Sequence, residues 1–285
     1  MIRIFADSTC DLSPELIERY KVTIIPLHVI LGEDDYLDGE SITPDGIYAW
    51  ADAHKATPKT AAVSMDDVMQ ALTPALEAGD EAICFAIASG MSTTGNVMRL
   101  AAQELGAEDR VSIVDTQNLS TGGGHLVIEA ARLAQEGLDR GRIVEYVEAL
   151  RPRVRASFIV DTLTYLHRGG RCSGLAALAG GALRLHPRIS VRDGKMQAEK
   201  KYRGKMSHAI PQYVKDMESE LLRAETGRVF ITHSGCEQAD IDAVHAYLTQ
   251  LEHFDEIHVT RAGGVISSHC GPGTLGVLFI AGQEA

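Results

Sequence analysis

Short apolar segments of strand length alternate with helix-like segments along the first half of this 285-residue chain. The strand-like segments end at turn residues, whereas the helix-like segments repeat apolar residues every three to four positions. The predicted strands are Ile2–Ala6, Val22–Leu31, Ala82–Ala88 and Val111–Asp115, and the predicted helices are Pro14–Tyr20, Val68–Leu76, a segment from after Ser92 to Leu105, and Gly122–Ala134. This alternation favours βαβ units and therefore a doubly wound, mainly parallel sheet of the α/β class.

The second half has a different pattern, which predicts an α+β domain with a mixed sheet. Its clearest signal is a hairpin, because Asp193-Gly194 separates the alternating segments Arg188–Arg192 and Met196–Tyr202. Further strands are predicted at Ser157–Asp161, at Arg228–His233 and twice near the C-terminus, and further helices before Gly169-Gly170 and at 175–185, 207–222 and 240–251. We therefore expect a first domain over residues 1–155 and a second over residues 156–285.

Charge is distributed unevenly along the chain. The net charge of −12 argues against a nucleic-acid-binding surface. Between Arg140 and Lys205, however, 15 Lys and Arg outnumber 5 Asp and Glu, which gives this basic block a local charge of +10. The block is either a solvated surface or a docking site for an acidic partner or a nucleotide.

The sequence predicts a cytoplasmic protein without a bound metal or cofactor. No apolar run approaches the length of about 18 residues that a membrane span needs, and the N-terminus lacks a basic-then-apolar signal. The five cysteines include no Cys-x-x-Cys pair, and the eleven histidines include no His-Glu-x-x-His motif. These absences argue against a disulfide framework and against a zinc site.

The segment Ile87-Ala-Ser-Gly-Met-Ser-Thr-Thr-Gly-Asn96 forms a corner between a predicted strand and a predicted helix. At this corner the Ser92 hydroxyl would cap the helix, and the free N–H groups of the first turn would point the same way. Such a corner binds a carboxylate or a phosphate without a formal positive charge, although Ser92 as a cap alone is the simpler alternative. Asp7-Ser-Thr9 and Asp115-Thr-Gln117 also follow strands, so we expect the three corners to converge on one crevice.

Known phosphate-binding and catalytic motifs fit this corner poorly. Gly90-Met-Ser-Thr-Thr-Gly95 lacks the Gly-Lys-Ser/Thr of a P-loop, and the glycine triplet 122–124 is no Rossmann fingerprint. The Gly-x-Ser-x-Gly elbow of serine hydrolases is missed by one residue, because Gly95 lies three positions after Ser92. A serine hydrolase that uses Ser92 at a strand-to-helix turn therefore stays open as an alternative.

Three segments of the second half place a charged or titratable side chain beside glycines. They are Gly169-Gly-Arg171, Tyr202-Arg-Gly-Lys205 and Ser268-His-Cys-Gly-Pro-Gly273. Glycine lets a backbone approach a ligand or a partner closely, and the arginine fork matches phosphate geometry. One such segment would be an ordinary turn, whereas three in one domain indicate a binding or docking role as readily as a structural one.

Taken in order, these segments resemble the motifs of the DegV family of bacterial fatty-acid-binding proteins over essentially the whole chain. The matching segments are Asp7-Ser-Thr-Cys-Asp-Leu12, Pro58-Lys-Thr60, Ala88-Ser-Gly-Met-Ser-Thr93, Asp161-Thr-Leu-Thr-Tyr-Leu166, Gly169-Gly-Arg171, Tyr202-Arg-Gly-Lys205, and His269 with Gly271-Pro-Gly-Thr-Leu-Gly276. The chain departs from the family pattern at Ala61-Ala62-Val63, where Ser-Gln-Pro is usual.

The resemblance implies a long-chain fatty acid, such as palmitate, in a ligand tunnel between two domains. It further implies a lipid-binding protein that is not itself an enzyme and that presents the acid to a separate fatty acid kinase, which forms an acyl phosphate for phospholipid metabolism. A nucleotide-dependent enzyme resembling the dihydroxyacetone kinases, whose fold is thought to be related, is a further alternative.

The same resemblance implies roles for individual residues. Thr60 and Ser92 would hold the carboxylate by motif position, with Gly90, Thr93 and His269 beside them in the ligand site, and Arg171, Arg203 and His269 would lie near the head group or on the surface that meets the kinase.

Overall fold

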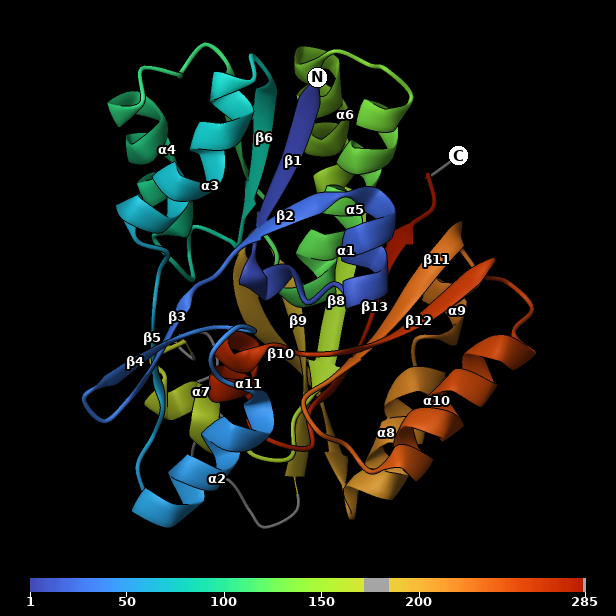
Figure 1. The fold of residues 1–285 in the computed structure, drawn as a ribbon. Helices are drawn as coiled ribbons and strands as arrows, with labels where there is room; N and C mark the ends of the chain where they lie inside the picture. Colours follow the sequence, from blue (N-terminus) through green and yellow to red (C-terminus); the bar gives the residue numbers. More distant parts are fainter. Residues whose placement is uncertain (172–184, 284–285) are drawn as a thin grey trace.

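The computed structural model describes residues 1–171 and 185–283, and within them the strands form three sheets (Figure 1). The first half of the chain builds a four-stranded parallel sheet in the order β2-β1-β6-β7. The bounds of these strands are Val22–Ile25 for β2, Ile2–Asp7 for β1, Glu81–Ala86 for β6 and Val111–Asp115 for β7. The central strands β1 and β6 carry mainly buried side chains, as expected for parallel strands covered on both faces, whereas the edge strands β2 and β7 are only partly buried.

Helices cover both faces of this sheet. The helices α3 (Met65–Glu77) and α4 (Thr94–Glu104) pack on one face, and α1 (Pro14–Tyr20), α5 (Ser120–Gln135) and α6 (Arg140–Leu150) pack on the other. The predicted doubly wound α/β arrangement is therefore confirmed.

The second half forms a six-stranded sheet in the order β10-β9-β8-β13-β11-β12. The bounds of its strands are Lys195–Arg203 for β10, Leu185–Arg192 for β9, Val154–Ile159 for β8, Leu275–Ala281 for β13, Ala224–His233 for β11 and Glu256–Arg261 for β12. The strands β11 and β12 are parallel and the other neighbours are antiparallel, so the predicted mixed sheet is confirmed.

The predicted hairpin is present as β9 and β10. Its turn residues Asp193 and Gly194 have φ angles of 49° and 72°, the left-handed pair that a type I′ turn requires. The helix predicted at 175–185 lies outside the described residues, apart from Leu185, which begins β9. The single helix predicted at 207–222 is instead two helices, α8 (Met206–Lys215) and α9 (Glu218–Leu221), which lie with α10 (Gln238–Gln250) on one face of the mixed sheet.

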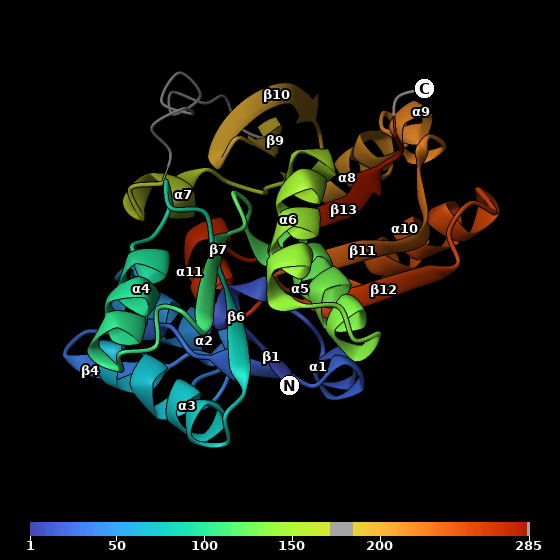
Figure 2. The ribbon, with the colours of Figure 1, turned by 90° about the horizontal axis from the view of Figure 1, so that it is seen from above.

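The helix α5 lies between the two large sheets and contacts strands of both (Figure 2). Most of its side chains are buried, on all sides of the helix. A Cβ atom at Gly124 would lie 2.9 Å from the Cys10 carbonyl oxygen and 2.8 Å from a Leu12 methyl carbon. The glycine triplet thus allows the first turn of α5 to pack tightly against the segment after β1.

The prediction of one strand over Val22–Leu31 is wrong. Pro26 lacks an N–H group and interrupts the ladder, so the segment divides into β2 in the parallel sheet and β3 (His28–Leu31) in a second sheet. This second sheet is antiparallel, with β3 between β4 (Asp34–Leu37) and β5 (Lys59–Ala61).

The remaining elements are short segments and one helix of moderate length. They are η1 (Ser8–Cys10), α2 (Pro44–His54), η2 (Arg151–Arg153), α7 (Thr164–Arg168) and α11 (Gly264–Cys270). The short helix α11 is near the C-terminus in sequence, yet it packs against α2, β3, β5 and α7. It therefore connects the three-stranded sheet of the first half to the second half.

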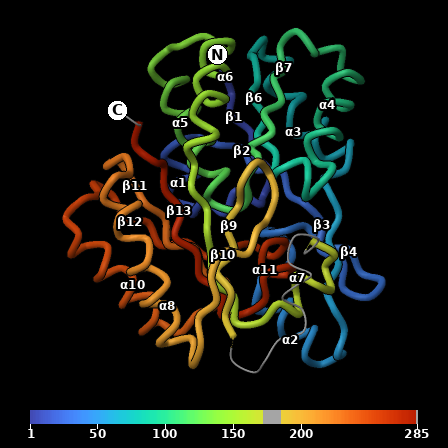
Figure 3. Tube along the Cα trace, turned by 180° about the vertical axis from the view of Figure 1, so that it is seen from behind, coloured from blue at the N-terminus to red at the C-terminus, as the bar shows by residue number. Residues whose placement is uncertain are grey.

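Of the three hydrophobic clusters among the described residues, one draws many side chains from both halves. A single cluster of buried side chains extends from Ile4 in β1 to Ile280 in β13. The β9–β10 hairpin also reaches the first sheet, where the Gly194 N–H donates to the Gln117 carbonyl at 3.1 Å (Figure 3). The domain boundary at residues 155 and 156 stays a prediction. In the part of the chain that the structure describes, no helix has the length and apolar character of a membrane span.

Candidate functional site

An apolar pocket with a few polar groups opens where segments of both halves meet. It contains about 520 Å³ of space free of protein atoms, including its open mouth, and ligand pockets typically measure about 300–1,000 Å³. Its polar lining comes from Thr60, Ser92, Arg171 and His269, and its apolar lining includes Leu27, Ile87, Met91, Leu119, Leu166, Met196, Val265 and Ile266. The family motifs in the sequence predict all four polar residues for the ligand site or the surface around it.

Two smaller cavities extend the pocket into the protein. The first, of about 330 Å³, shares Leu119, Ile266 and Cys270 with the pocket and is also lined by Phe158 and Leu278. The second, of about 190 Å³, shares Leu119 and Ile87 with it. Leu119 borders all three spaces.

Thr60 and His269 form a hydrogen bond at the pocket although 209 positions separate them in the sequence. The Thr60 Oγ1 and His269 Nε2 atoms are 2.8 Å apart. Thr60 stands on β5, where it pairs with Val29 of β3, and His269 stands on the last turn of α11. The packing of α11 against this small sheet therefore decides whether the two side chains meet.

His269 is electrically neutral near pH 7. Burial lowers the pKa of its imidazole to about 4, and the positive charge of Arg171 acts in the same direction. A neutral imidazole that donates from Nε2 to Thr60 leaves the Thr60 hydroxyl proton free for another acceptor. The pair can thus present an O–H donor to an anion in the pocket without placing a cation there.

Ser92 lies in the loop between β6 and α4. Its Oγ accepts the Thr94 N–H at 3.3 Å and lies 2.9 Å from Thr94 Oγ1. The helix begins at Thr94, and the cap residue Thr93 makes no side-chain hydrogen bond to it. The Ser92 hydroxyl therefore binds a first-turn N–H, as the strand-to-helix corner predicts, and also borders the pocket.

The other predicted residues lie around the pocket without lining it. Thr93 is exposed, and Arg203 is exposed at the end of β10. Gly90 is exposed too, and a Cβ atom there would lie 3.0 Å from the Gly194 carbonyl oxygen, so this glycine allows the loop to approach the hairpin turn. Arg171, by contrast, lines the pocket; it is exposed at the mouth, where it donates to the Gly169 carbonyl at 2.7 Å.

Two glycines of the predicted motifs let α7 and α11 pack tightly beside the pocket. A Cβ atom at Gly169 would lie 2.2 Å from His269 Nδ1, and one at Gly271 would lie 2.5 Å from the ring of Tyr165. His269 Nδ1 is buried and has no hydrogen-bond partner among the described residues. These glycines thus bring two parts of this chain together, whereas the sequence suggested a ligand or a partner.

Three buried carboxylates connect the segments that carry the polar groups. Asp7 accepts the Ile87 N–H at 2.7 Å, at the start of the Ser92 loop. Asp11 accepts the Gly263 N–H at 2.8 Å, and Asp38 accepts the Gly264 N–H at 2.6 Å, at the beginning of α11. Burial raises the pKa of all three, that of Asp7 to about 6, although these hydrogen bonds oppose the shift.

The three predicted polar corners are joined by hydrogen bonds but do not line one crevice. Besides the Ile87 N–H that donates to Asp7, the Ser89 N–H donates to Asp115 at 3.3 Å, whereas the pocket lined by Ser92 includes no residue of the other two corners. Asp38 was not predicted, because it lies after β4 in a segment without any recognised motif. Within residues 1–171 and 185–283, no group of three or more His, Cys, Asp or Glu side chains is placed to hold a metal ion.

The model of the DegV family, described as a family of uncharacterised proteins, matches residues 1–282. The chain belongs to the DegV family. A DegV domain-containing protein from Deinococcus radiodurans is 36% identical over 277 residues, which cover 97% of each chain. Membership thus extends over both halves of the chain and includes every segment of the pocket.

Solved DegV structures share this fold. A DegV family protein from Thermus thermophilus, reported for its fatty acid binding, aligns with a TM-score of 0.89 at 32% identity and covers 98% of this chain and 99% of its own. A stearic acid-binding protein from Eubacterium ventriosum aligns with a TM-score of 0.86 at 27% identity, with 99% and 98% covered. This DegV protein therefore has the architecture of two relatives described by the fatty acids they bind.

Proposed function

We propose that this DegV protein binds a long-chain fatty acid, such as palmitate, with its carboxylate held by Thr60 and Ser92. The observation that carries the proposal is the Thr60–His269 hydrogen bond at the mouth of an apolar pocket. The descriptions of the Thermus and Eubacterium relatives support the same ligand class.

The acyl tail supplies most of the affinity. Each buried methylene contributes about 0.8 kcal/mol, so a tail of about sixteen carbons supplies on the order of 10 kcal/mol before ordering costs. The tail enters the pocket past Leu119 toward the adjoining cavity lined by Phe158 and Leu278. Its head group can therefore be bound by neutral donors.

The carboxylate stays ionised and reactive at such a site. Thr60 donates its hydroxyl proton while His269 donates to Thr60, and Ser92 supplies a second hydroxyl. Arg171 contributes positive charge from the rim, where solvent screens it. Uncharged donors orient the carboxylate oxygens without the tight ion pair that would weaken their nucleophilicity.

This reactivity suits presentation to a separate fatty acid kinase, with the chain itself acting as a lipid-binding protein without catalytic activity. The exposed Arg171 and Arg203 would meet the kinase or the phosphate being transferred. A cytoplasmic location and a role in phospholipid metabolism are parts of this proposal, because acyl-phosphate formation consumes a cytoplasmic nucleotide.

The contacts of Ser92 favour binding over serine hydrolysis. A serine hydrolase needs a general base, most often an imidazole, within hydrogen-bond reach of its nucleophile. Here the Ser92 hydroxyl bonds Thr94, and His269 Nε2 bonds Thr60.

The test of the ligand is mass spectrometry of an organic extract of the purified protein, followed by fatty acid affinity measurements on variants. We expect Thr60→Val and Ser92→Ala to weaken palmitate binding about tenfold or more each, since a hydrogen bond to a charged group contributes about 1.5–3 kcal/mol. Thr93→Ala is the matched control, because this neighbouring hydroxyl lies outside the pocket lining. An empty extract together with unchanged affinity in both pocket variants would refute the proposal.

The test of presentation is acyl-phosphate formation with a bacterial fatty acid kinase subunit. We expect Arg203→Ala to keep palmitate affinity and to lower turnover at least tenfold. Lys201→Ala is the control, because Lys201 is exposed on the same strand two positions away. Equal turnover in the two variants would contradict the placement of Arg203 on the surface that meets the kinase.

A further inference from the structure

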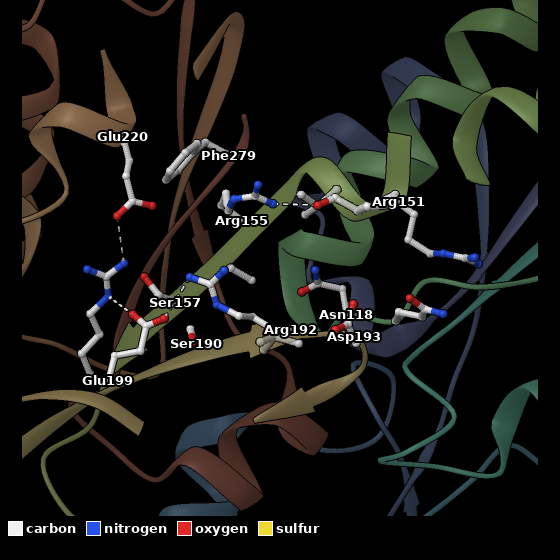
Figure 4. A pocket seen from close by; sticks show the side chains of 16 residues that line it. Asn118, Arg151, Arg155, Ser157, Ser190, Arg192, Asp193, Glu199, Glu220 and Phe279 are labelled. Atoms are coloured by element: carbon white, nitrogen blue, oxygen red, sulfur yellow. Dashed lines mark hydrogen bonds and ion pairs between the residues drawn. The ribbon is translucent and has the colours of Figure 1, made fainter. Parts of the chain in front are cut away.

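A second cavity lies on the other side of the β9–β10 hairpin from the fatty acid pocket. It contains about 750 Å³ of space free of protein atoms, including its opening, and shares no lining residue with that pocket. Its walls come from β8, β9, η2, α9 and the loop after β7 (Figure 4). Four arginines line it, Arg151, Arg155, Arg188 and Arg192, and all four belong to the basic block.

The acidic residues of this arginine cavity only partly balance its charge. Glu199 pairs with two guanidinium groups, that of Arg188 at 3.1 Å and that of Arg192 at 3.2 Å. Glu220 lies 3.7 Å from Arg188, and Asp193 stands on the hairpin turn.

The other two arginines reach mainly neutral acceptors. Arg155 donates to the Pro152 carbonyl at 2.7 Å, and Arg151 donates to the Asp115 carbonyl at 2.9 Å and lies 3.9 Å from Glu148. Among the described residues, the four arginines therefore share one cavity with three carboxylates, those of Asp193, Glu199 and Glu220. Glu199 already pairs with two of the arginines.

Three polar atoms of the cavity lining are buried and lack a hydrogen-bond partner of normal geometry in the described part of the chain. They are the Ser190 hydroxyl oxygen, Arg151 Nε and Arg188 Nε. Arg188 Nε nevertheless lies 3.1 Å from a Glu199 carboxylate oxygen, and the Ser190 hydroxyl helps to lower the pKa of Glu199. A buried polar group without a partner costs about 1–3 kcal/mol, so a bound anion with free acceptor oxygens would relieve this cost. Arg188 lies deep in the cavity, with 11% of its side chain exposed. Arg192 lies at the opening, with 56% of its side chain exposed.

We propose that the arginine cavity binds a phosphate dianion, either free or as the phosphate end of a small metabolite. Guanidinium groups bind phosphate oxygens with paired, charge-assisted hydrogen bonds, and a dianion relieves the repulsion among neighbouring arginines. Figure 4 shows Arg155 and Arg192 extending from β8 and β9 into the same space, with Ser157 and Ser190 beside them. The phosphate sits between these guanidinium groups and accepts a hydrogen bond from the Ser190 hydroxyl.

The test is calorimetric titration of the full chain with inorganic phosphate and separately with AMP, at an ionic strength held constant with chloride. We expect saturable binding, and we expect Arg192→Gln and Arg155→Gln each to weaken it at least tenfold. Arg142→Gln is the matched control, since it removes one charge of the same basic block from an exposed position on α6. Should an arginine variant fail to fold, Ser190→Ala replaces it, with an expected weakening of at least threefold.

Each outcome decides the proposal. Tighter binding of phosphate than of AMP indicates a free anion as the ligand, and tighter binding of AMP indicates a phosphorylated metabolite. Absence of saturable binding overturns the proposal, and so does an Arg142→Gln variant that weakens binding as much as Arg192→Gln. The measurement does not depend on fatty acid binding, because the two spaces share no lining residue.

Discussion

The fatty acid pocket and the arginine cavity lie on opposite sides of one hairpin and differ in how they are charged. The pocket brings Thr60, Ser92 and a neutral His269 together, and Arg171 is the arginine that the described residues place at its mouth. The cavity collects four arginines, of which Arg188 is almost buried. Both spaces suit an anion, but their ligands obtain affinity from different sources.

The difference follows from what each ligand can bury. A fatty acid buries a long tail, so its receptor needs donors that orient the head group and little charge. A phosphate has no apolar surface to bury, so its receptor must supply charged hydrogen-bond donors. Changes of pH, of packing and of salt concentration should therefore affect the two spaces differently.

Acidification should disrupt the fatty acid pocket most strongly. The folded state lowers the pKa of His269 from 6.5 to about 4, so between these values the unfolded chain binds a proton that the folded chain does not. Stability therefore falls as pH drops through this window, by about 3 kcal/mol for this group. Urea unfolding should show wild type losing stability relative to His269→Gln between about pH 7 and pH 4, and a constant difference would contradict the assignment.

A methyl group at Gly169 should disturb the pocket and spare the cavity. The new Cβ atom would lie 2.2 Å from His269 Nδ1 and would displace the imidazole from Thr60. We expect Gly169→Ala to cost about 1–3 kcal/mol of unfolding free energy and to weaken palmitate binding. Gly227→Ala is the control, because a Cβ atom there has no neighbour within 4 Å. Equal effects of the two substitutions would mean that the imidazole is not held in place by this contact.

Salt should separate the two ligands. Raising ionic strength from about 0.1 M to about 1 M shortens the Debye length from about 10 Å to about 3 Å. Phosphate affinity should fall roughly tenfold because Arg155 and Arg192 supply it from the surface, whereas palmitate affinity should stay the same or rise. Parallel titrations of both ligands measure this, and an equal loss for both would mean that the pocket also depends on charge.

The smallest expected effect concerns the sheet that carries Thr60. His28 of β3 contacts Asp67 at 3.0 Å and Asp35 at 2.9 Å. Burial by itself would lower the pKa of His28, but the hydrogen bonds with Asp67 and Asp35 outweigh it and raise the pKa. The stabilisation is thus complete below the unfolded pKa and is lost as pH rises through the folded one.

His28→Gln should therefore destabilise the protein by less than about 1 kcal/mol at mildly acidic pH and by nothing at alkaline pH. Urea unfolding of wild type and variant at several pH values measures this difference. If the destabilisation by His28→Gln does not change with pH, it comes from lost packing and not from the charge of His28.

Elements with strong local periodicity could be predicted from the sequence, and elements held by tertiary contacts could not. The strand β7 and the β9–β10 hairpin were predicted because their patterns and turn residues act locally. The helix α11 was missed because its seven residues, Gly-Val-Ile-Ser-Ser-His-Cys, are too few for a periodic pattern. Its first N–H groups are instead bound by Asp11 and Asp38, which are distant in the sequence.

In the fatty acid pocket and the arginine cavity too, the sequence indicated the residues but not which of them meet. Thr60, Ser92 and His269 were predicted from motif order, yet no pattern indicated that Thr60 would bond His269 across 209 positions. The arginine cavity was present in the sequence only as excess charge between Arg140 and Lys205, because a charge count does not tell which side chains share a space.

The sequence by itself determined the alternation of strands and helices that builds the parallel sheet, the α/β class of the first half and the residues available for an anion site. Tertiary structure decided which of these residues meet, how far His269 is buried and which arginines share a cavity. The physical reason is that periodicity and turn chemistry act over a few residues, whereas burial and pairing depend on segments that only packing brings together.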